Sequence, residues 1–247
     1  MEHLAELLAE ILRDEVKCIE SMALAFSGGL DSGILAYLLR DCNVKFYTVG
    51  IEGSMDIQNA LNAAELLGIE VESIEINEND VLEGLLFLKR VDPEINALES
   101  SFELPLYFVL SYAYEDNIMT GQGSDELFGG YAKYLENSQL MNEDLNRLLV
   151  KTKPREMRMA ALLGKDLITP YLEKRVMEFA INTPLEMKIK NGIRKYILRE
   201  AARILGVPKS IVEREKKAAQ YGSGVWKIMK KMAKDRDMSV EEFVKSL

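Results

Sequence analysis

The chain has 247 residues, of which 48% are hydrophobic and 29% are charged, and its net charge is −9. This length predicts one large domain or two that pack closely, and the composition is that of an ordinary globular protein. No cluster of lysines and arginines stands beside aromatic residues, so we expect no nucleic acid as a partner. The single histidine, His3, excludes catalytic triads built on histidine and zinc sites that contain it.

Two cysteines, Cys18 and Cys42, lack the CxxC spacing of metal or redox sites, and we expect both to be buried thiols in a reducing compartment. The start of the chain carries Glu2, Glu6 and Glu10 and no basic segment, which is unlike a signal peptide. No run of apolar residues reaches the length of a membrane span. The sequence therefore predicts a cytoplasmic protein that does not associate with membranes.

Helices and strands alternate along the first half of the chain. Apolar residues at helical spacing predict helices over residues 2–20, 34–40, 57–67, 81–91 and 104–114. Apolar and β-branched runs predict strands over residues 22–26, 44–49, 69–76 and 117–120. This alternation predicts an α/β fold with a doubly wound parallel sheet, whose ligands lie at the carboxyl ends of the strands.

The second half of the chain shows a different pattern. From about residue 133 helical periodicity dominates, and no further strand is predicted. The sequence Ser-Val-Glu-Glu at 239–242 is a capping box that begins the last predicted helix. We therefore divide the chain into an α/β domain over residues 1–135 and an all-helical lobe over residues 136–247, which packs on the sheet.

The first glycine-rich turn lies between the first predicted strand and the helix that follows. Gly28 and Gly29 let the backbone approach an anion closely, and Ser27 and Ser32 add hydroxyl donors beside a helix N-terminus. This arrangement predicts a phosphate-binding site. Asp31 stands inside the same turn, and a carboxylate beside phosphates indicates that Mg²⁺ lies between them.

The segment Ser-Gly-Gly-Leu-Asp-Ser at 27–32 resembles the pyrophosphate-binding loop of the N-type ATP pyrophosphatases. The resemblance implies an enzyme that splits ATP into AMP and pyrophosphate while it adenylates a substrate. It also implies that ATP and Mg²⁺ are the cofactors and that the domain over residues 1–135 binds the nucleotide.

A second glycine-rich turn, residues 121–131, follows the last predicted strand and carries Gln122, Asp125 and Glu126. The carboxyl ends of parallel strands meet at one edge of a sheet, so we expect the two turns to converge. Asp31 and Asp125 would then share a Mg²⁺ ion that bridges the phosphates of ATP.

Together, the two turns resemble the synthetase domain of glutamine-dependent asparagine synthetases and, more loosely, the β-lactam and carbapenam synthetases. Residues 49–56 are similar to the family segment near the adenosine. Residues 164–171 are similar to a family stretch with an acidic position, here Asp166, and Arg158 matches an upstream arginine. Residues 195–200 and 216–224 resemble the family's Lys-x-[Ile/Leu]-Leu-Arg segment and its late basic loop, so the match runs from about residue 21 to 226.

The resemblance implies a set of site residues. Contacts with ATP and pyrophosphate are implied at Ala25, Ser27, Gly28, Gly29, Asp31, Ser32, Val49, Gly50, Thr120, Gly121, Lys216 and Lys217. Asp31 and Asp125 are implied as the metal ligands, and Lys195, Asp166 and Gln122 as the catalytic residues. Lys195, on the helical lobe, would neutralise the negative charge that develops on the α-phosphate and on the later oxyanion.

The chain departs from this family in two respects. It begins Met1-Glu2 and lacks the glutaminase domain, so we expect a synthetase domain that stands alone. The amine would be free ammonia, ammonia from a glutaminase partner, or a group of the substrate. Gln122 stands where the asparagine synthetases have Glu and the β-lactam synthetases have Tyr, and an amide does not accept a proton.

Another group must therefore act as the base, and Asp166, Glu99 and Glu103 are the alternatives. The segment before Pro105 has no arginine, so the sequence does not indicate aspartate as the acceptor. The resemblance implies an ATP-dependent, amide-forming ligase that acts on a small-molecule carboxylate and releases AMP and pyrophosphate.

One alternative is an ATP-binding, synthetase-like subunit that is inactive without a glutaminase partner. A tRNA-modifying enzyme of the same loop superfamily is a weaker alternative, because the chain is acidic and has no basic tract. The oligomeric state, including a homo-oligomer, stays open.

Overall fold

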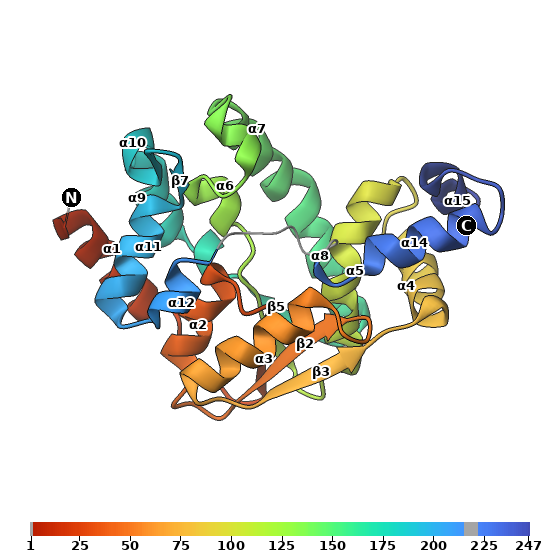
Figure 1. Cartoon of the computed structure of the whole chain (residues 1–247), viewed down its shortest axis with the longest axis horizontal. Coiled ribbons are helices and arrows are strands. Elements are labelled where there is room, and N and C mark those ends of the chain that lie inside the picture. The colour runs from red at the N-terminus through yellow and green to blue at the C-terminus, as the bar shows by residue number, and fades with distance from the viewer. Residues whose placement is uncertain (1, 215–221) are drawn as a thin grey trace.

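The computed structural model describes residues 2–214 and 222–247, and its centre is a five-stranded parallel sheet (Figure 1). The strands lie in the order β3-β2-β1-β4-β5, so the chain first builds the sheet outward from β1 in one direction and then in the other. The strands are β1 (Met22–Ala25), β2 (Val44–Gly50), β3 (Val71–Glu75), β4 (Asn117–Met119) and β5 (Asp166–Ile168). The predicted doubly wound parallel sheet is confirmed.

Most of the remaining residues are helical. The helices of the first half are α1 (Glu2–Glu15), α2 (Leu30–Leu39), α3 (Met55–Leu67), α4 (Glu78–Val91), α5 (Ala97–Tyr112), α6 (Ser124–Phe128) and the 3-10 helix η1 (Ala132–Leu135). Those of the second half are α7 (Leu140–Arg147), the π-helix η2 (Leu148–Thr152), α8 (Lys153–Leu162), the 3-10 helix η3 (Pro170–Leu172), α9 (Lys174–Asn182), α10 (Leu185–Lys188), α11 (Tyr196–Leu205), α12 (Lys209–Val212), α14 (Val225–Lys234) and α15 (Val240–Lys245). A hairpin of β6 (Ile189–Lys190) and β7 (Ile193–Arg194) precedes α11. None of the described helices combines the length and the apolar character needed to cross a bilayer.

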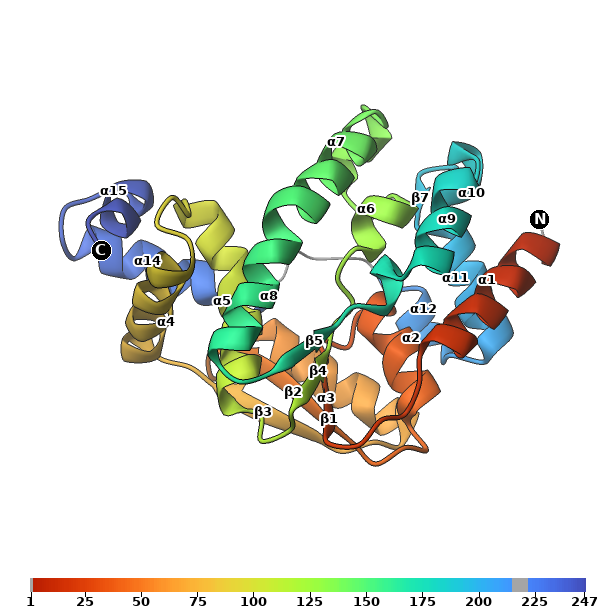
Figure 2. The ribbon, with the colours of Figure 1, turned by 180° about the vertical axis from the view of Figure 1, so that it is seen from behind.

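The two faces of the sheet bury separate hydrophobic cores. Met22 and Leu24 of β1 point into a core formed with α1, α2, α9 and α11, whereas Ala23 points into one formed with α4, α5, α8 and α14. Figures 1 and 2 show these two groups of helices on opposite sides of the molecule. A parallel sheet that is covered on both faces needs strands that are apolar on both faces, which is why β1 reads as a continuous apolar run.

The structure corrects the sequence prediction at two elements. The second half of the chain is not entirely helical, because β5 pairs with β4 at the edge of the sheet and β6 pairs with β7. The helix predicted over 104–114 begins earlier, at Ala97. The Asn96 side chain accepts a hydrogen bond from the Glu99 amide, and the Glu99 side chain accepts one from the Asn96 amide, which caps the helix at this end. Glu99 and Glu103 therefore lie on a helix rather than in a loop.

The prediction of two buried thiols is wrong. Cys18 and Cys42 form a disulfide with a Cα–Cα distance of 5.9 Å, and Cys18 is exposed. The two residues come shortly before β1 and β2, which are neighbours with Met22 opposite Val44. The pairing thus follows from the order of the strands, which the cysteine spacing alone does not reveal.

We expect the double variant Cys18→Ser/Cys42→Ser to lose about 3 kcal/mol of unfolding free energy, because the disulfide closes a loop between residues 24 positions apart. Urea unfolding without reductant measures this loss. Addition of a reductant to the wild-type protein is the control and should produce a loss of the same size. Equal stability of the oxidised and the reduced wild-type protein would contradict the prediction.

Candidate functional site

The turn between β1 and α2 is shaped to hold an anion. Gly28 has a φ of +67°, and an added Cβ would lie 2.5 Å from the backbone oxygen of Asn59, so only glycine fits there. The Ser27 amide donates to the Ser32 hydroxyl at 3.3 Å, which closes the turn. Gly29 is the N-cap of α2 and has no side chain to cap it, so the amides of the first helical turn are available to a ligand.

The turn after β4 lies against the first one. An added Cβ at Gly121 would be 3.1 Å from the Cβ of Asp31 and 3.5 Å from the amide of Ser32. The hydroxyl of Tyr171 donates to the backbone oxygen of Asp31 at 3.1 Å and holds the start of α2 from the other side. The two glycine-rich turns therefore meet at the carboxyl edge of the sheet.

Lys195 joins the acidic residues of both turns. Its ammonium group lies 2.6 Å from each carboxylate oxygen of Asp31, 2.7 Å from Oδ1 of Asp125 and 2.7 Å from the hydroxyl of Ser124. Burial lowers the pKa of Lys195, and the Asp31 carboxylate opposes that shift. The arrangement places one positive charge between two carboxylates, beside the turn that joins β1 and α2.

Gly130 makes room for this cluster. An added Cβ would lie 1.8 Å from Oδ1 of Asp125 and 2.4 Å from Cε of Lys195. The backbone oxygen of Gly130 accepts a hydrogen bond from Arg194, the residue before Lys195, at 2.8 Å. The glycine thus lets the second turn and the N-terminus of α11 approach closely.

Four other predicted site residues lie at the same edge. They stand at or just beyond the carboxyl ends of β1, β2 and β4, and they are Ala25, Val49, Gly50 and Thr120. The Ile51 amide donates to the backbone oxygen of Ser223, so residues near the start of α14 close the end of β2. Lys216 and Lys217 lie outside the described residues.

Asp166, which was expected to be a catalytic residue, does not lie at this edge. It is the first residue of β5, it pairs with Asn117, and Asn117 in turn pairs with Met22, the first residue of β1. Asp166 is therefore exposed at the amino ends of the strands, one strand length away from the glycine-rich turns. The strand β5 was not predicted, so the sequence gave no indication of the edge on which Asp166 lies.

Gln122 is bonded to a second, buried group of charges. Its amide nitrogen donates to Oε1 of Glu156 on α8 at 2.7 Å. Arg155, the neighbouring residue, is 2% exposed and donates to Oε1 of Glu103 at 2.7 and 3.0 Å and to Asp92 at 3.1 Å. Burial raises the pKa of Glu103 to about 6, while Arg155 opposes the rise. Burial likewise raises the pKa of Glu156 well above its usual range, and the charge of Glu103 adds to the effect.

Comparison with known proteins identifies the architecture. The family model for asparagine synthase matches residues 3–144 and 138–242. The chain belongs to the asparagine synthase family. A putative glutamine-hydrolyzing asparagine synthetase of Methanocaldococcus jannaschii is 29% identical over 297 aligned positions, which cover 100% of this chain and 54% of that protein. The glutamine-hydrolyzing asparagine synthetase of Gallus gallus is 30% identical over 79% of this chain and 38% of its own length.

The chain thus spans about half of the length of the first of these asparagine synthetases and less than half of the second. It corresponds to their synthetase part. Among solved structures, NMN synthetase from Francisella tularensis is 15% identical with a TM-score of 0.47, covering 99% of this chain and 92% of that one.

Two buried charged residues next to the second glycine-rich turn, Arg155 and Glu156, were missed by the sequence interpretation. They lie in the run Lys153-Pro154-Arg155-Glu156, which looks like the solvated first turn of any helix. No spacing or motif separates them from exposed charges, because their burial depends on the packing of α8 against α5.

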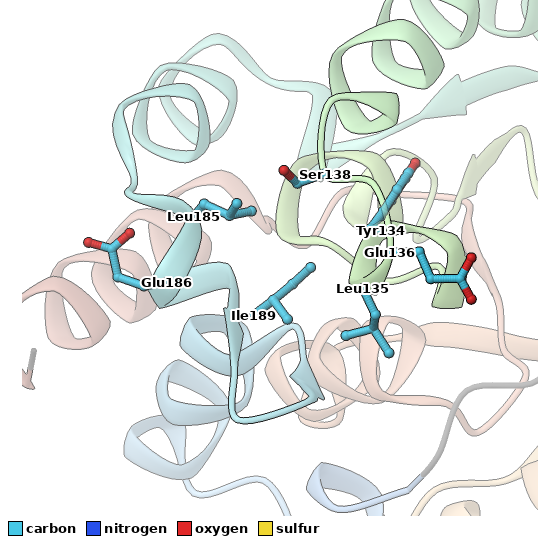
Figure 3. A pocket seen from close by; sticks show the side chains of 7 residues that line it. All are labelled: Tyr134, Leu135, Glu136, Ser138, Leu185, Glu186 and Ile189. Atoms are coloured by element: carbon cyan, nitrogen blue, oxygen red, sulfur yellow. The ribbon is translucent and has the colours of Figure 1, made fainter.

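A surface pocket of about 360 Å³ lies between η1 and α10 (Figure 3). It is lined by Tyr134, Leu135, Glu136, Ser138, Leu185, Glu186 and Ile189. Ile189 also packs against Gly129, where an added Cβ would lie 2.8 Å from its side chain. The lining includes two carboxylates and none of the predicted site residues of the asparagine synthase family, so this pocket is unsuited to a polyphosphate.

Proposed function

We propose that the chain is an ATP-dependent, amide-forming ligase that adenylates a small-molecule carboxylate and releases AMP and pyrophosphate. The observation that carries this proposal is the ammonium group of Lys195, which lies between Asp31 and Asp125 where two glycine-rich turns meet. Membership of the asparagine synthase family supports it. The amine is ammonia, either free or delivered by a glutaminase partner, as the names of the glutamine-hydrolyzing relatives suggest.

In this proposal the backbone amides around Gly28 and Gly29 bind the phosphates of ATP, and the hydroxyls of Ser27 and Ser32 add donors. The carboxylate of the substrate attacks the α-phosphorus, and the bond to pyrophosphate breaks. Lys195 stabilises the charge that grows on the α-phosphate, because it is fixed in a buried position before the reaction begins. Ammonia then attacks the acyl-adenylate, and AMP leaves.

The residues fit a Mg²⁺ ion that is shared with the phosphates. Asp31 and Asp125 are close enough to bind one ammonium group, so they are close enough to bind one divalent ion. No group of three or more His, Cys, Asp or Glu residues within residues 2–214 and 222–247 is arranged to hold a metal by itself. Phosphate oxygens would therefore complete the coordination, and the ion would neutralise phosphate charge.

Incubation of the protein with ATP, Mg²⁺, ammonium and a panel of carboxylates tests the proposal. We expect AMP and pyrophosphate in equal amounts with at least one carboxylate, whereas ADP and phosphate without AMP would overturn the reaction class. The variants Asp31→Asn and Asp125→Asn should each form AMP about 10²-fold more slowly, because a ligand for the cation is lost. Asp166→Asn is the matched control and should keep the wild-type rate, because Asp166 lies at the opposite edge of the sheet.

A further inference from the structure

The side chain of Arg214 contacts the turn between β1 and α2. Its Nη1 donates to the backbone oxygen of Gly28 at 2.5 Å and lies 3.4 Å from the backbone oxygen of Asn59. Its Nη2 donates to the side-chain oxygen of Asn59. Because Asn59 belongs to α3, the guanidinium group joins the glycine-rich turn to a neighbouring helix.

A second arginine fixes the backbone of Arg214. Arg199, on α11, donates to the backbone oxygen of Arg214 at 3.1 Å and to that of Val212. Its Nε donates to the backbone oxygen of Arg194 at 2.9 Å, just before α11 begins. These contacts keep the backbone of Arg214 in place, so its guanidinium group is held beside the turn before a ligand binds.

The contact with Arg214 bears on the peptide group between Gly28 and Gly29. Two glycines flank this group, so it can rotate as a unit at little steric cost. The peptide is trans, and its C=O and N–H groups therefore point in opposite directions. With the oxygen held by Arg214, the Gly29 amide points away from the guanidinium group. In the described part of the chain this amide donates to no other backbone group, so it is available to an anion.

The opposite orientation of this peptide would disfavour a phosphate. After a rotation of about 180°, the Gly28 oxygen would replace the Gly29 amide, and its partial negative charge would repel phosphate oxygens. The hydrogen bond from Arg214 to Gly28 would be lost at the same time. A hydrogen bond from a charged donor to a backbone oxygen favours one of two such orientations roughly 10- to 100-fold.

We propose that Arg214 is a positioning residue that holds the Gly28–Gly29 peptide with its amide directed at the phosphates of ATP. The role rests on the proposed ligase function for the identity of this anion, and it deepens that function. Arg214 acts through the peptide and not by contact with the nucleotide. Without it, only a fraction of the free protein has the orientation that binds phosphate, and the apparent Kd rises in proportion.

The variant Arg214→Met tests this role. We expect the Kd for inorganic pyrophosphate with Mg²⁺ and the KM for ATP each to rise about tenfold or more. The kcat for AMP formation should stay within about threefold of wild type, because saturating ATP selects the binding orientation. Calorimetric titration measures the Kd, and AMP release measures KM and kcat. An unchanged Kd for pyrophosphate overturns the inference, as does a loss confined to kcat.

Arg13→Met is the matched control. Arg13 is exposed on α1, so the same substitution should change neither the Kd nor the KM. A wild-type protein that binds pyrophosphate and forms no AMP would overturn the proposed ligase function, and the Kd values would still decide the role of Arg214. Circular dichroism of each variant shows whether it is folded.

The variant Gly29→Ala separates the orientation of the peptide from any other effect of Arg214. Gly29 has a φ of −76°, which alanine adopts without strain, and an added Cβ would lie 3.4 Å from Oγ of Ser27. The rotated peptide requires a positive φ at residue 29, which alanine disfavours. The loss of pyrophosphate affinity on Arg214→Met should therefore be at least about fivefold smaller in the Gly29→Ala background. Equal losses in the two backgrounds overturn the inference.

The conservative variant Arg214→Lys provides an independent measurement. Lysine keeps a positive charge and a donor for the Gly28 oxygen, although it cannot also bridge to Asn59 in the same forked geometry. We expect it to bind pyrophosphate at least about threefold more tightly than Arg214→Met and more weakly than the wild-type protein. An affinity no better than that of Arg214→Met overturns the inference.

Discussion

Replacement of Lys195 by methionine is expected to slow the formation of AMP and pyrophosphate by about 10³-fold. The ammonium group is held by Asp31, Asp125 and Ser124 and is almost completely buried. Methionine has a similar length and no charge, so the variant removes the electrostatic stabilisation and little of the packing. Steady-state AMP release at saturating ATP measures the effect.

The conservative variant Lys195→Arg should also be inactive. Cε of Lys195 lies so close to Gly130 that a Cβ added there would be 2.4 Å away, which leaves no space for a guanidinium group. Binding of a fluorescent ATP analogue provides the control. In both variants the affinity for the ATP analogue should change much less than the rate of AMP formation, because the charge that Lys195 stabilises develops in the transition state. A rate for the methionine variant within tenfold of wild type would contradict this role.

Replacement of Arg155 by methionine is expected to lower the free energy of unfolding by about 3–5 kcal/mol. Arg155 is 2% exposed and forms ion pairs with Glu103 and Asp92. A carboxylate oxygen of Glu99 also lies 3.6 Å from its guanidinium group. Its removal leaves Glu103, itself 2% exposed, without a cation. Urea unfolding at pH 8 measures the loss.

The loss should depend on pH. Burial raises the pKa of Glu103 to about 6 even with Arg155 present, and Arg155 lowers it, so the pKa rises further in the variant. A carboxyl group whose pKa is higher in the folded than in the unfolded state takes up protons on folding, so stability falls as the pH rises through the folded pKa. The difference in unfolding free energy between the variant and the wild-type protein should therefore be smaller at pH 5 than at pH 8.

Arg158→Met on the same helix is the control for both measurements. Arg158 is exposed, so the same substitution should cost less than about 0.5 kcal/mol and show no added pH dependence. An equal loss of unfolding free energy in the two variants would show that α8 is destabilised by any substitution of this kind. That result would contradict the prediction that the buried ion pairs of Arg155 stabilise the fold.

The sheet and the two glycine-rich turns could be predicted because their signals are local. The run 22–26 is apolar throughout, and Gly28 and Gly121 stand just beyond strand ends, where the close approach of neighbouring atoms requires glycine. Strand β5 was not predicted, because three residues are too few to show the alternation of apolar and polar residues that indicates a strand. The unexpected position of Asp166 has the same origin, because Asp166 was placed in the site from a motif and not from a strand.

The missed features depend on contacts between distant parts of the chain. The disulfide requires that β1 and β2 be neighbours, and the burial of Arg155 and Glu156 requires that α8 pack on α5. Neither requirement appears in the order of residues. Lys195 could be proposed only from a family resemblance, and its contacts with Asp31, Asp125 and Ser124 come from the tertiary structure.

The position of β5 has a consequence for synthesis on the ribosome. β4 gains its second neighbour only after the whole of α6, η1, α7, η2 and α8 has been translated (Figure 2). At roughly 5–20 residues per second, an unpaired backbone edge of the nascent sheet is exposed to the cell for several seconds. Translation that stops before residue 166 would release a chain with this edge uncovered, and such a fragment should be a substrate for chaperones and proteases.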